Sequence, residues 1–449
     1  MSQFDLLIEC GYLLDVRAND CKILEKQLIG VQNGQFALIE PTTDKNVNLK
    51  QNAKKYIDAR EQLLIPGLIN GHTHLPMSLF RGLAEDMEFQ EWLHQYILPI
   101  ENKILDEDFV RVGTELSLWE SASYGVTTFN DMYYYTPIVA DAILRSGLRG
   151  IVAQTFMDFP TPDNKQGGDN SEKLLLQSVE FCKNESRVRV SLAPHAPYTC
   201  NDETIKKTIR LAEKHQLSIH IHVSETKFEV DESQKIYNKS PVQRLWDLGL
   251  MKIPSVFAHG VHLSSSDLDL LQKSNTSVIH NPESNMKIAA GIASIPELLN
   301  RNIPVGLGTD GCASNNNLNL VCEMDVAAKL QKLKHLGKGL TAKQILRMAT
   351  IEGARALHWD DKIGSVEVGK FADFALLKLD VPHMQPTHDL LSHLVYSANG
   401  SEIEETYCEG QKVYDRSGPT RLDRLKILKE TDFFKNKIAQ FLSQNKTPN

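Results

Sequence analysis

The sequence of 449 residues lacks several features that mark specialised classes of protein. Its seven cysteines are dispersed, odd in number and never spaced as CxxC, which argues against a disulfide framework and against a thiolate zinc site. Its first residues contain no basic segment followed by an apolar run, and no stretch reaches the roughly 18 consecutive apolar residues of a membrane span. We therefore expect a cytoplasmic protein with reduced cysteines and no membrane partner.

The chain also lacks an excess of positive charge and clusters of basic residues. The formal net charge is -8, and lysines and arginines are scattered along the chain rather than gathered into blocks. Proteins that bind the phosphate backbone of nucleic acids need a basic patch, so nucleic acid is not an expected partner. The chain does have 41% hydrophobic and 24% charged residues, a composition typical of a globular protein with a substantial core.

Both ends of the chain show the alternating apolar and polar positions of β-strands. Near the N-terminus, Asn33-Gly34 separates two strand-like runs, which predicts a tight hairpin. After about residue 365 the same character returns, with expected strand connections at Gly369-Lys370 and Glu409-Gly410. These two β segments, although far apart in sequence, could share one small sheet unit.

Eight short apolar runs lie between these ends, each followed by a polar or helical stretch. They are LLIPGLIN, GVTTFNDM, RGIVAQTF, VRVSLAPH, SIHIHVSE, SVFAHGVH, SVIHNPES and VGLGTDG. Residues 105–125 between two runs read as a helix, and Thr341 with Gln344 resembles a capping box at a helix start. Alternating strands and helices predict an α/β protein with a parallel sheet, and eight units predict a (β/α)8 barrel.

Polar functional groups end nearly every run, where barrel enzymes carry their chemistry. His72 and His74 lie two residues apart on an extended segment, so their rings project to the same side. Alone, this pair could equally be two ordinary polar strand residues. His222 from the fifth run and Asp310 from the eighth complete a donor set that suits zinc or iron(II). His220 shares the parity of His222 but lies farther from the mouth, so we interpret it as a hydrogen-bonded barrel histidine.

Two nucleotide-related sequence signatures do not indicate a binding or catalytic site in this chain. Residues 306–311 formally match the dinucleotide fingerprint GxGxxG, but the match is late in the chain and does not open a Rossmann unit. We interpret its glycines as permitting a sharp turn behind Asp310. The HxE and PCxxC elements of the cysteine-ligated zinc deaminases form no site in this sequence.

Taken together, several motifs resemble those of the amidohydrolase superfamily, and within it the deaminases of 5′-methylthioadenosine and S-adenosylhomocysteine, close to the aminotriazine and chlorohydrolase-like branch. The motifs are PGLINGHTH, HVSE, AHGVH, HNPESNMKIAAG and GTDGCASNN, and the resemblance covers nearly the whole chain. It implies a catalytic (β/α)8 barrel over residues 63–365. It also implies a flanking composite β-sandwich domain, built from residues 1–62 and 366–449 and including a C-terminal helix.

The same resemblance implies that His72, His74, His222 and Asp310 bind metal. Members with two metal ions carry a lysine near the end of the fourth strand, where this chain has LAPHAPYT and His195. We therefore expect one divalent ion, with zinc as the first choice and iron(II) as the second.

The reaction implied is hydrolytic deamination of an adenosine-type nucleoside to the inosine analogue and ammonia. Glu225 matches the family glutamate that protonates a ring nitrogen, although a surface glutamate after a strand would look the same. His259 matches the histidine that orients the attacking hydroxide; a buried structural imidazole is the alternative, as it is for His262. Asp310 is expected to be both a ligand and the base that takes the proton from water.

Substrate contacts are implied for a further set of residues. By resemblance, this set comprises Glu101 for the ribose hydroxyls, Trp92 for the base or ribose, and His195, His280, Glu225 and Asp310 for the nucleoside. Two of these have simpler interpretations, because Trp92 fits a core position and Glu101 fits the first turn of a helix, where its charge suits the dipole.

The preferred 5′ substituent depends on one departure from the family pattern. Relatives that accept S-adenosylhomocysteine carry arginines around the third strand, whereas an ungapped count places Gln154 there and the following loop offers only Lys165. A carboxylate without a cationic partner loses affinity, while a methylthio group suits apolar contacts with Phe156, Met157 and Phe159. We therefore predict a preference for 5′-methylthioadenosine over S-adenosylhomocysteine.

The same motifs also fit other functions. Adenosine itself is an alternative substrate, and related barrels hydrolyse triazines, guanine, cytosine or other amino-heterocycles with the same metal core. A non-catalytic scaffold is disfavoured because the whole ligand set is present. By family resemblance we expect a homo-oligomer, with a dimer as the simplest state.

Overall fold

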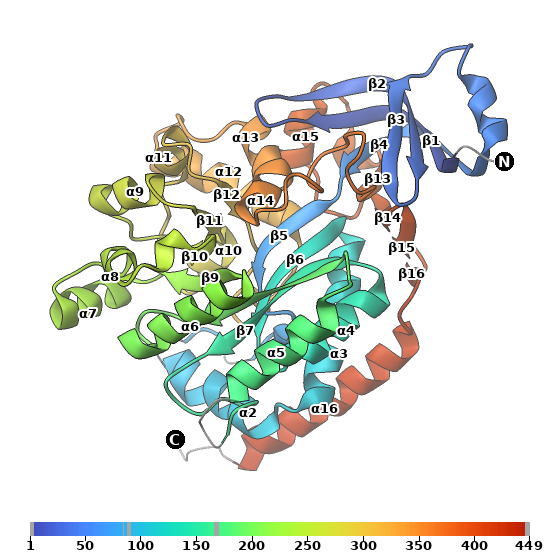
Figure 1. Cartoon of the computed structure of the whole chain (residues 1–449). Helices are drawn as coiled ribbons and strands as arrows, with labels where there is room; N and C mark the ends of the chain where they lie inside the picture. The colour runs from blue at the N-terminus through green and yellow to red at the C-terminus, as the bar shows by residue number, and fades with distance from the viewer. Residues whose placement is uncertain (1–3, 84, 88–90, 166–169, 445–449) are drawn as a thin grey trace.

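The centre of the molecule is a barrel of eight parallel strands (Figure 1). The computed structural model describes residues 4–83, 85–87, 91–165 and 170–444. In sequence order the barrel strands are β5 (Leu68–Thr73), β6 (Val126–Tyr133), β7 (Arg149–Phe156), β8 (Val188–Pro194), β9 (Ser218–Val223), β10 (Ser255–His259), β11 (Thr276–His280) and β12 (Val305–Leu307). Each strand comes from one of the eight apolar runs, so the predicted α/β barrel is confirmed.

The first and last barrel strands meet and nearly close the barrel. The amide of Asp310, just beyond β12, donates to the carbonyl of His72 in β5 at 3.0 Å. Glycine permits this approach, because a Cβ added at Gly308 would lie 2.8 Å from the same carbonyl oxygen. The glycines behind Asp310 thus allow close backbone packing rather than phosphate binding.

Helices surround the barrel and cover the outer face of its strands. Those after the first strands are η2 (Leu75–Phe80), the π-helical turn η3 (Trp92–Ile97), α2 (Leu98–Ile104), α3 (Glu107–Ser123), α4 (Thr136–Ser146), α5 (Asn170–Cys182) and α6 (Asp202–His215). Those after the later strands are α7 (Lys227–Tyr237), α8 (Pro241–Leu248), η4 (Leu250–Lys252), α9 (Ser265–Gln272), α10 (Pro282–Lys287), α11 (Ile295–Asn300), α12 (Leu320–Lys334), α13 (Ala342–Met348) and α14 (Ile351–Ala356).

Two of the predicted helix starts are present in the structure. The side chain of Asp106 accepts the amide of Phe109 and caps α3, within the predicted helix of residues 105–125. Thr341 and Gln344 form the predicted capping box at the start of α13. No helix of the described residues is long and apolar enough to cross a membrane.

The two ends of the chain build a second sheet beside the barrel (Figure 1). Its strands, in spatial order, are β16 (Gly418–Pro419), β15 (Gln411–Asp415), β14 (Ile403–Cys408), β13 (Phe374–Lys378), β4 (Ala53–Pro66), β1 (Phe4–Val16), β2 (Cys21–Gln32) and β3 (Gln35–Pro41). One apolar cluster contains side chains from both ends, among them Ile8, Ile29, Phe374 and Tyr407. The expected second unit made of both chain ends is therefore confirmed, and its strands form one continuous sheet.

Two details of the expected strands differ. Residues 365–368 form turns and coil instead of a strand, because their polar groups are used locally: the amide of Lys370 donates to the carbonyl of Glu367. The first apolar run is divided between two sheets, since β4 continues to Pro66 in the terminal sheet and β5 begins at Leu68. The domain boundaries at 62/63 and 365/366 stay a prediction, and residues 1–3 and 445–449 of that prediction lie outside the described residues.

The remaining elements pack on the second sheet, on the barrel helices or on both. They are η1 (Val47–Asn52), η5 (Pro382–Met384), α15 (Leu390–Tyr396) and α16 (Arg424–Gln444). The C-terminal helix α16 returns to the barrel and packs on α3, where the rings of Phe109 and Phe434 lie 5.2 Å apart and Arg111 pairs with Glu430 at 2.9 Å.

Candidate active site

Four of the predicted metal ligands come together at the carboxyl ends of the barrel strands. His72 lies near the end of β5, His74 directly follows β5, His222 lies near the end of β9, and Asp310 lies three residues beyond β12. Asp310 Oδ1 is 3.2 Å from Nε2 of both His72 and His74, and His222 Nε2 is 3.3 Å from His74 Nε2. Three imidazoles and one carboxylate therefore present their donor atoms to one small space.

The other nitrogen of each imidazole is held by a hydrogen bond. His74 Nδ1 donates to the carbonyl of Met132 at 2.5 Å, and His222 Nδ1 donates to the carbonyl of His195 at 2.8 Å. Because a carbonyl only accepts, both rings keep Nε2 free as a potential ligand atom. His72 Nδ1 shares a 2.9 Å hydrogen bond with Nε2 of His220, so His220 supports a ligand, as the interpretation of a barrel histidine predicts.

The donor set fits a divalent cation. His72 Nε2 is buried, and its 3.2 Å contact with Asp310 Oδ1 is too poorly aligned for a regular hydrogen bond, an arrangement that is costly for a polar atom unless something else satisfies it. Burial lowers the pKa of His72 to about 3 and that of His222 well below its usual value, so both rings are neutral, as ligands must be. Burial acts in the same direction on His74, but the hydrogen bond and charge of Asp310 outweigh it and raise this pKa to about 9, so a bound cation would have to displace a proton from His74 Nε2.

Asp310 is oriented by two serines that the sequence analysis did not single out. Its Oδ2 accepts the hydroxyl of Ser284 at 2.6 Å and that of Ser314 at 2.8 Å, which leaves Oδ1 to face the histidines. Asp310 itself has a left-handed φ of 62°, an uncommon conformation for a residue with a side chain. The surrounding hydrogen bonds thus fix one carboxylate oxygen at the centre of the cluster.

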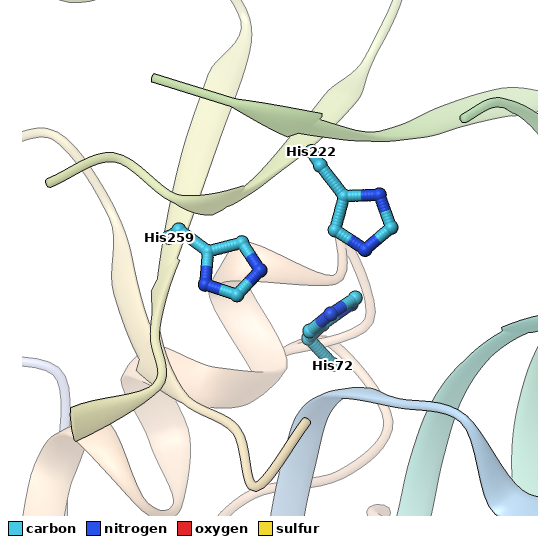
Figure 2. A group of neighbouring side chains, drawn as sticks. All are labelled: His72, His222 and His259. Atoms are coloured by element: carbon cyan, nitrogen blue, oxygen red, sulfur yellow. The ribbon is translucent and has the colours of Figure 1, made fainter. Parts of the chain in front are cut away.

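Glu225 and His259, the other predicted catalytic residues, lie against the same cluster. His259 Nε2 is 3.6 Å from Glu225 Oε1, and His259 Nδ1 is 2.9 Å from the side-chain oxygen of Asn285. Figure 2 shows the rings of His72, His222 and His259 directed toward one common space. Burial raises the pKa of Glu225, so this carboxyl holds a proton more readily than an exposed glutamate. His262 takes no part, because its Nε2 donates to the carbonyl of Ala290 at 2.7 Å.

A cavity of about 480 Å³ opens beside the cluster. Its lining includes His74, Glu101 and His195, which agrees with the predicted substrate side of the site. Glu101 lies in α2, where Tyr133 from the end of β6 donates its hydroxyl to Glu101 Oε1 at 2.6 Å. Burial raises the pKa of Glu101 to about 7. Tyr133 went unnoticed in the sequence, although it ends an apolar run in the same way as the ligands do.

Other predicted substrate residues lie elsewhere. Trp92 lines a smaller cavity of about 100 Å³, together with Ser314, and His280 is fully buried within β11. Gln154 is buried and turned away, since its side chain bonds to Thr136 and Asp163. Lys165 is exposed and is absent from the described lining of the larger cavity. Residues 166–169 of the same loop lie outside the described residues.

A parallel barrel with histidines and an aspartate gathered at its strand ends is the arrangement of a hydrolase that could hold a metal ion. The chain belongs to the amidohydrolase family, whose family model matches residues 63–413. Among curated relatives, a 5-methylthioadenosine/S-adenosylhomocysteine deaminase of Syntrophobacter fumaroxidans is 39% identical over 415 residues, which cover 92% of this chain and 94% of the relative. A 5′-deoxyadenosine deaminase of Methanosphaera stadtmanae is 41% identical over 361 residues, which cover 80% and 84% of the two chains.

Two solved structures share the fold of this chain. An adenosine deaminase from Xanthomonas campestris with bound zinc superposes with a TM-score of 0.93 at 32% identity, over 97% of this chain and 99% of that one. The atrazine chlorohydrolase of Arthrobacter aurescens TC1 has a TM-score of 0.86 at 22% identity, over 96% of this chain and 100% of that one, which shows a shared fold alone.

Proposed function

We propose that this protein hydrolytically deaminates an adenosine-type nucleoside, with 5′-methylthioadenosine as the preferred substrate. The observation that carries the proposal is the buried pair of Glu225 and His259 beside Asp310, facing the histidine cluster. The names of the relatives, which are deaminases of 5-methylthioadenosine, S-adenosylhomocysteine and 5′-deoxyadenosine, support the same reaction. In the overall reaction, nucleoside and water give the inosine analogue and ammonia.

One divalent ion would be held by His72, His74, His222 and Asp310. We propose zinc, with iron(II) as the alternative; the zinc in the Xanthomonas campestris adenosine deaminase supports this order. When bound, such an ion lowers the pKa of its water to about 7 and so supplies a nucleophile at neutral pH.

The protein's own groups move the protons. Glu225 donates its proton to a nitrogen of the purine ring, which makes the neighbouring carbon electrophilic; the resulting carboxylate then takes the remaining proton of the added hydroxyl group and gives it to the amino group, which departs as ammonia. Asp310 accepts the proton of the attacking water on Oδ1, since Oδ2 is engaged by Ser284 and Ser314. His259, held by Asn285, orients the nucleophile.

The substrate is held on the cavity side of the cluster. Glu101 would accept the ribose hydroxyls on Oε2, since Tyr133 engages Oε1. His195 would contact the nucleoside from the end of β8. For Trp92 and His280 we retain the weaker proposal of substrate contact, because neither lines the larger cavity within the described residues.

The preference for a neutral 5′ group follows from the charges in the cavity. Its lining contains a single described arginine, Arg244, and no lysine. Asp202 pairs with Arg244 at 2.8 Å, and the carbonyl of Cys200 accepts from the same guanidinium at 3.0 Å. Because the described lining offers no unpaired lysine or arginine, the carboxylate of S-adenosylhomocysteine would lose its hydration without such a partner. Met157 and Phe159 offer apolar contacts to a methylthio group.

Ammonia release tests the proposal. We expect the highest kcat/KM for 5′-methylthioadenosine among this compound, S-adenosylhomocysteine, adenosine, guanine, cytosine and melamine, and we expect zinc bound to the active protein. Equal or better kcat/KM for S-adenosylhomocysteine would contradict the preference, and turnover of guanine, cytosine or melamine alone would contradict the reaction. His222→Ala should lose both metal and activity; full activity of this variant without metal would overturn the mechanism. We also propose a cytoplasmic homodimer, which light scattering can check for its mass.

A further inference from the structure

Glu229, in the first turn of α7, has a buried side-chain carboxyl group that has no role in the proposed reaction. Only 2% of the residue is exposed. Burial raises the pKa of Glu229 to about 8, and the partners that act against this rise within the described residues are two backbone amides rather than a cation. Burying a carboxylate without a cation costs free energy that its hydrogen bonds must offset. Such an arrangement calls for an explanation.

The two amides that Glu229 accepts belong to the turn that carries Glu225. Glu229 Oε1 accepts the amide of Ser224 at 2.8 Å, and Oε2 accepts the amide of Glu225 at 2.9 Å. Ser224 has a left-handed φ of 54°, which is unfavourable for a residue with a side chain and needs support from its surroundings. The same turn is also tied to the loop after β10, since the carbonyl of Ser224 accepts the amides of Val261 and His262.

Helix capping does not explain this geometry. Thr226 caps α7, and Thr226 with Glu229 has the spacing of a capping box, yet Glu229 does not return to the amide of its own N-cap residue. In a regular capping box of this chain, Asp267 accepts the amide of the N-cap residue Ser264. Glu229 instead reaches one and two residues farther, to the turn between a metal-binding histidine and the proposed acid.

We propose that Glu229 is a positioning residue, which holds the Ser224-Glu225 turn so that the carboxyl of Glu225 faces His259. The inference rests on the proposed function, because it assigns to Glu229 the placement of the proton donor. Both oxygens of Glu229 are occupied by the backbone, so the residue has no acceptor left for substrate although it borders the cavity. Glutamine has the same shape but directs its amide NH2 group, a donor, toward one of the two backbone N–H groups, which releases the turn.

A double-mutant cycle with Glu225 tests this role. We expect Glu229→Gln to lower kcat about 10- to 100-fold, the range known for groups that orient a catalytic site, with KM changed less than about twofold. Glu225→Gln should lower kcat by about 10²- to 10⁴-fold, the usual contribution of a general acid. Since Glu229 acts through Glu225, adding Glu229→Gln to Glu225→Gln should cost less than about twofold more. A structural role would lower activity by the same factor in both backgrounds.

Two further variants complete the design. Asp231→Asn removes an exposed carboxylate of the same helix, which pairs with Lys227, and should leave kcat, KM and metal content unchanged. Glu229→Asp keeps a carboxyl group that can accept both amides and should retain more of kcat than Glu229→Gln. The aspartate variant also serves as the test if the glutamine variant folds poorly. Equal losses in both backgrounds, a change confined to KM, or full activity of Glu229→Gln would overturn the inference. Absence of ammonia release by the wild-type protein would instead contradict the proposed function on which it rests.

Discussion

The buried hydrogen bond between Tyr133 and Glu101 determines which carboxylate oxygen is available in the cavity. A hydrogen bond to a carboxylate favours its ionised form, so this bond opposes the effect of burial on the pKa of Glu101, which is raised to about 7. Removing the hydroxyl should therefore raise the pKa further. Less of Glu101 is then ionised at neutral pH, and fewer carboxylates can accept the ribose hydroxyls.

For Tyr133→Phe we expect about a tenfold loss of kcat/KM at pH 7 for 5′-methylthioadenosine, the size of a hydrogen bond to a charged group. The acidic limb of the pH profile of kcat/KM should move to higher pH, because Glu101 with a higher pKa stays protonated up to a higher pH. Measuring kcat/KM against pH for the nucleoside and for its 2′,3′-dideoxy analogue checks both points. The analogue lacks the ribose hydroxyls, so Tyr133→Phe should change kcat/KM for the analogue by less than about twofold.

A matched control exists in the terminal sheet. Tyr56 donates its hydroxyl to Glu9 at 2.6 Å. Tyr56→Phe therefore removes the same kind of hydrogen bond in the terminal sheet, and it should leave the pH profiles for the nucleoside and for the analogue unchanged. An equal loss for the nucleoside and the dideoxy analogue would refute the role given to Glu101 and Tyr133.

At the scale of elements, most of the architecture follows from sequence patterns. The eight apolar runs predict the barrel strands because parallel strands are buried on both faces. Asn33 and Gly34 both have positive φ in the tight turn that their sequence predicts. Gly67 separates strands of two different sheets, which no local pattern reveals, and residues 365–368 look like a strand but satisfy their polar groups in turns.

The cluster of proposed metal ligands is predictable in the same way, because its members lie at or just beyond strand ends. Glu229 is not, since its sequence signal is a T-x-x-E helix start, and only the fold reveals that its oxygens bind another turn. Ser284 and Ser314 could not be predicted from the sequence either, because serines are common in loops. Only the fold shows that their hydroxyls donate to Asp310.

The join between β12 and β5 gives a prediction for an element. A Cβ at Gly308 would lie 2.8 Å from the backbone oxygen of His72, so Gly308→Ala must push the two strands apart. We expect a loss of about 1–3 kcal/mol of unfolding free energy, as for other overpacked sites, together with weaker metal binding. Urea unfolding and metal titration measure these effects.

Gly150→Ala provides the comparison on another barrel strand. Its nearest obstacle would be the terminal carbon of Ile143 at 2.8 Å, the movable end of a side chain, while the nearest backbone oxygen is 3.5 Å away. The loss should be smaller than for Gly308→Ala. Equal stability of Gly308→Ala and wild type would contradict the close packing proposed at this join.

For the molecule as a whole, the proposed metal site connects the beginning and the end of the barrel. Two ligands belong to the first strand segment, one to β9 and one to the segment after β12, so an ion would crosslink regions more than 200 residues apart in sequence, from His74 to Asp310. A ligand that binds only the folded state stabilises it by an amount that grows with its concentration relative to Kd. Metal binding should therefore stabilise the entire barrel, beyond its effect on catalysis.

Chelation tests this coupling. The metal-free protein should unfold at a lower temperature than the zinc form, and free zinc at about 1,000 times Kd should restore roughly 4 kcal/mol of stability together with ammonia release. His222→Ala, which retains the barrel but loses one ligand, should show little response of its unfolding temperature to zinc. If wild type and variant respond equally, the ion binds elsewhere; if neither activity nor stability depends on metal, the ligand set proposed here is wrong. Joint recovery in the wild type alone would connect the four strand-end ligands to both the fold and the reaction.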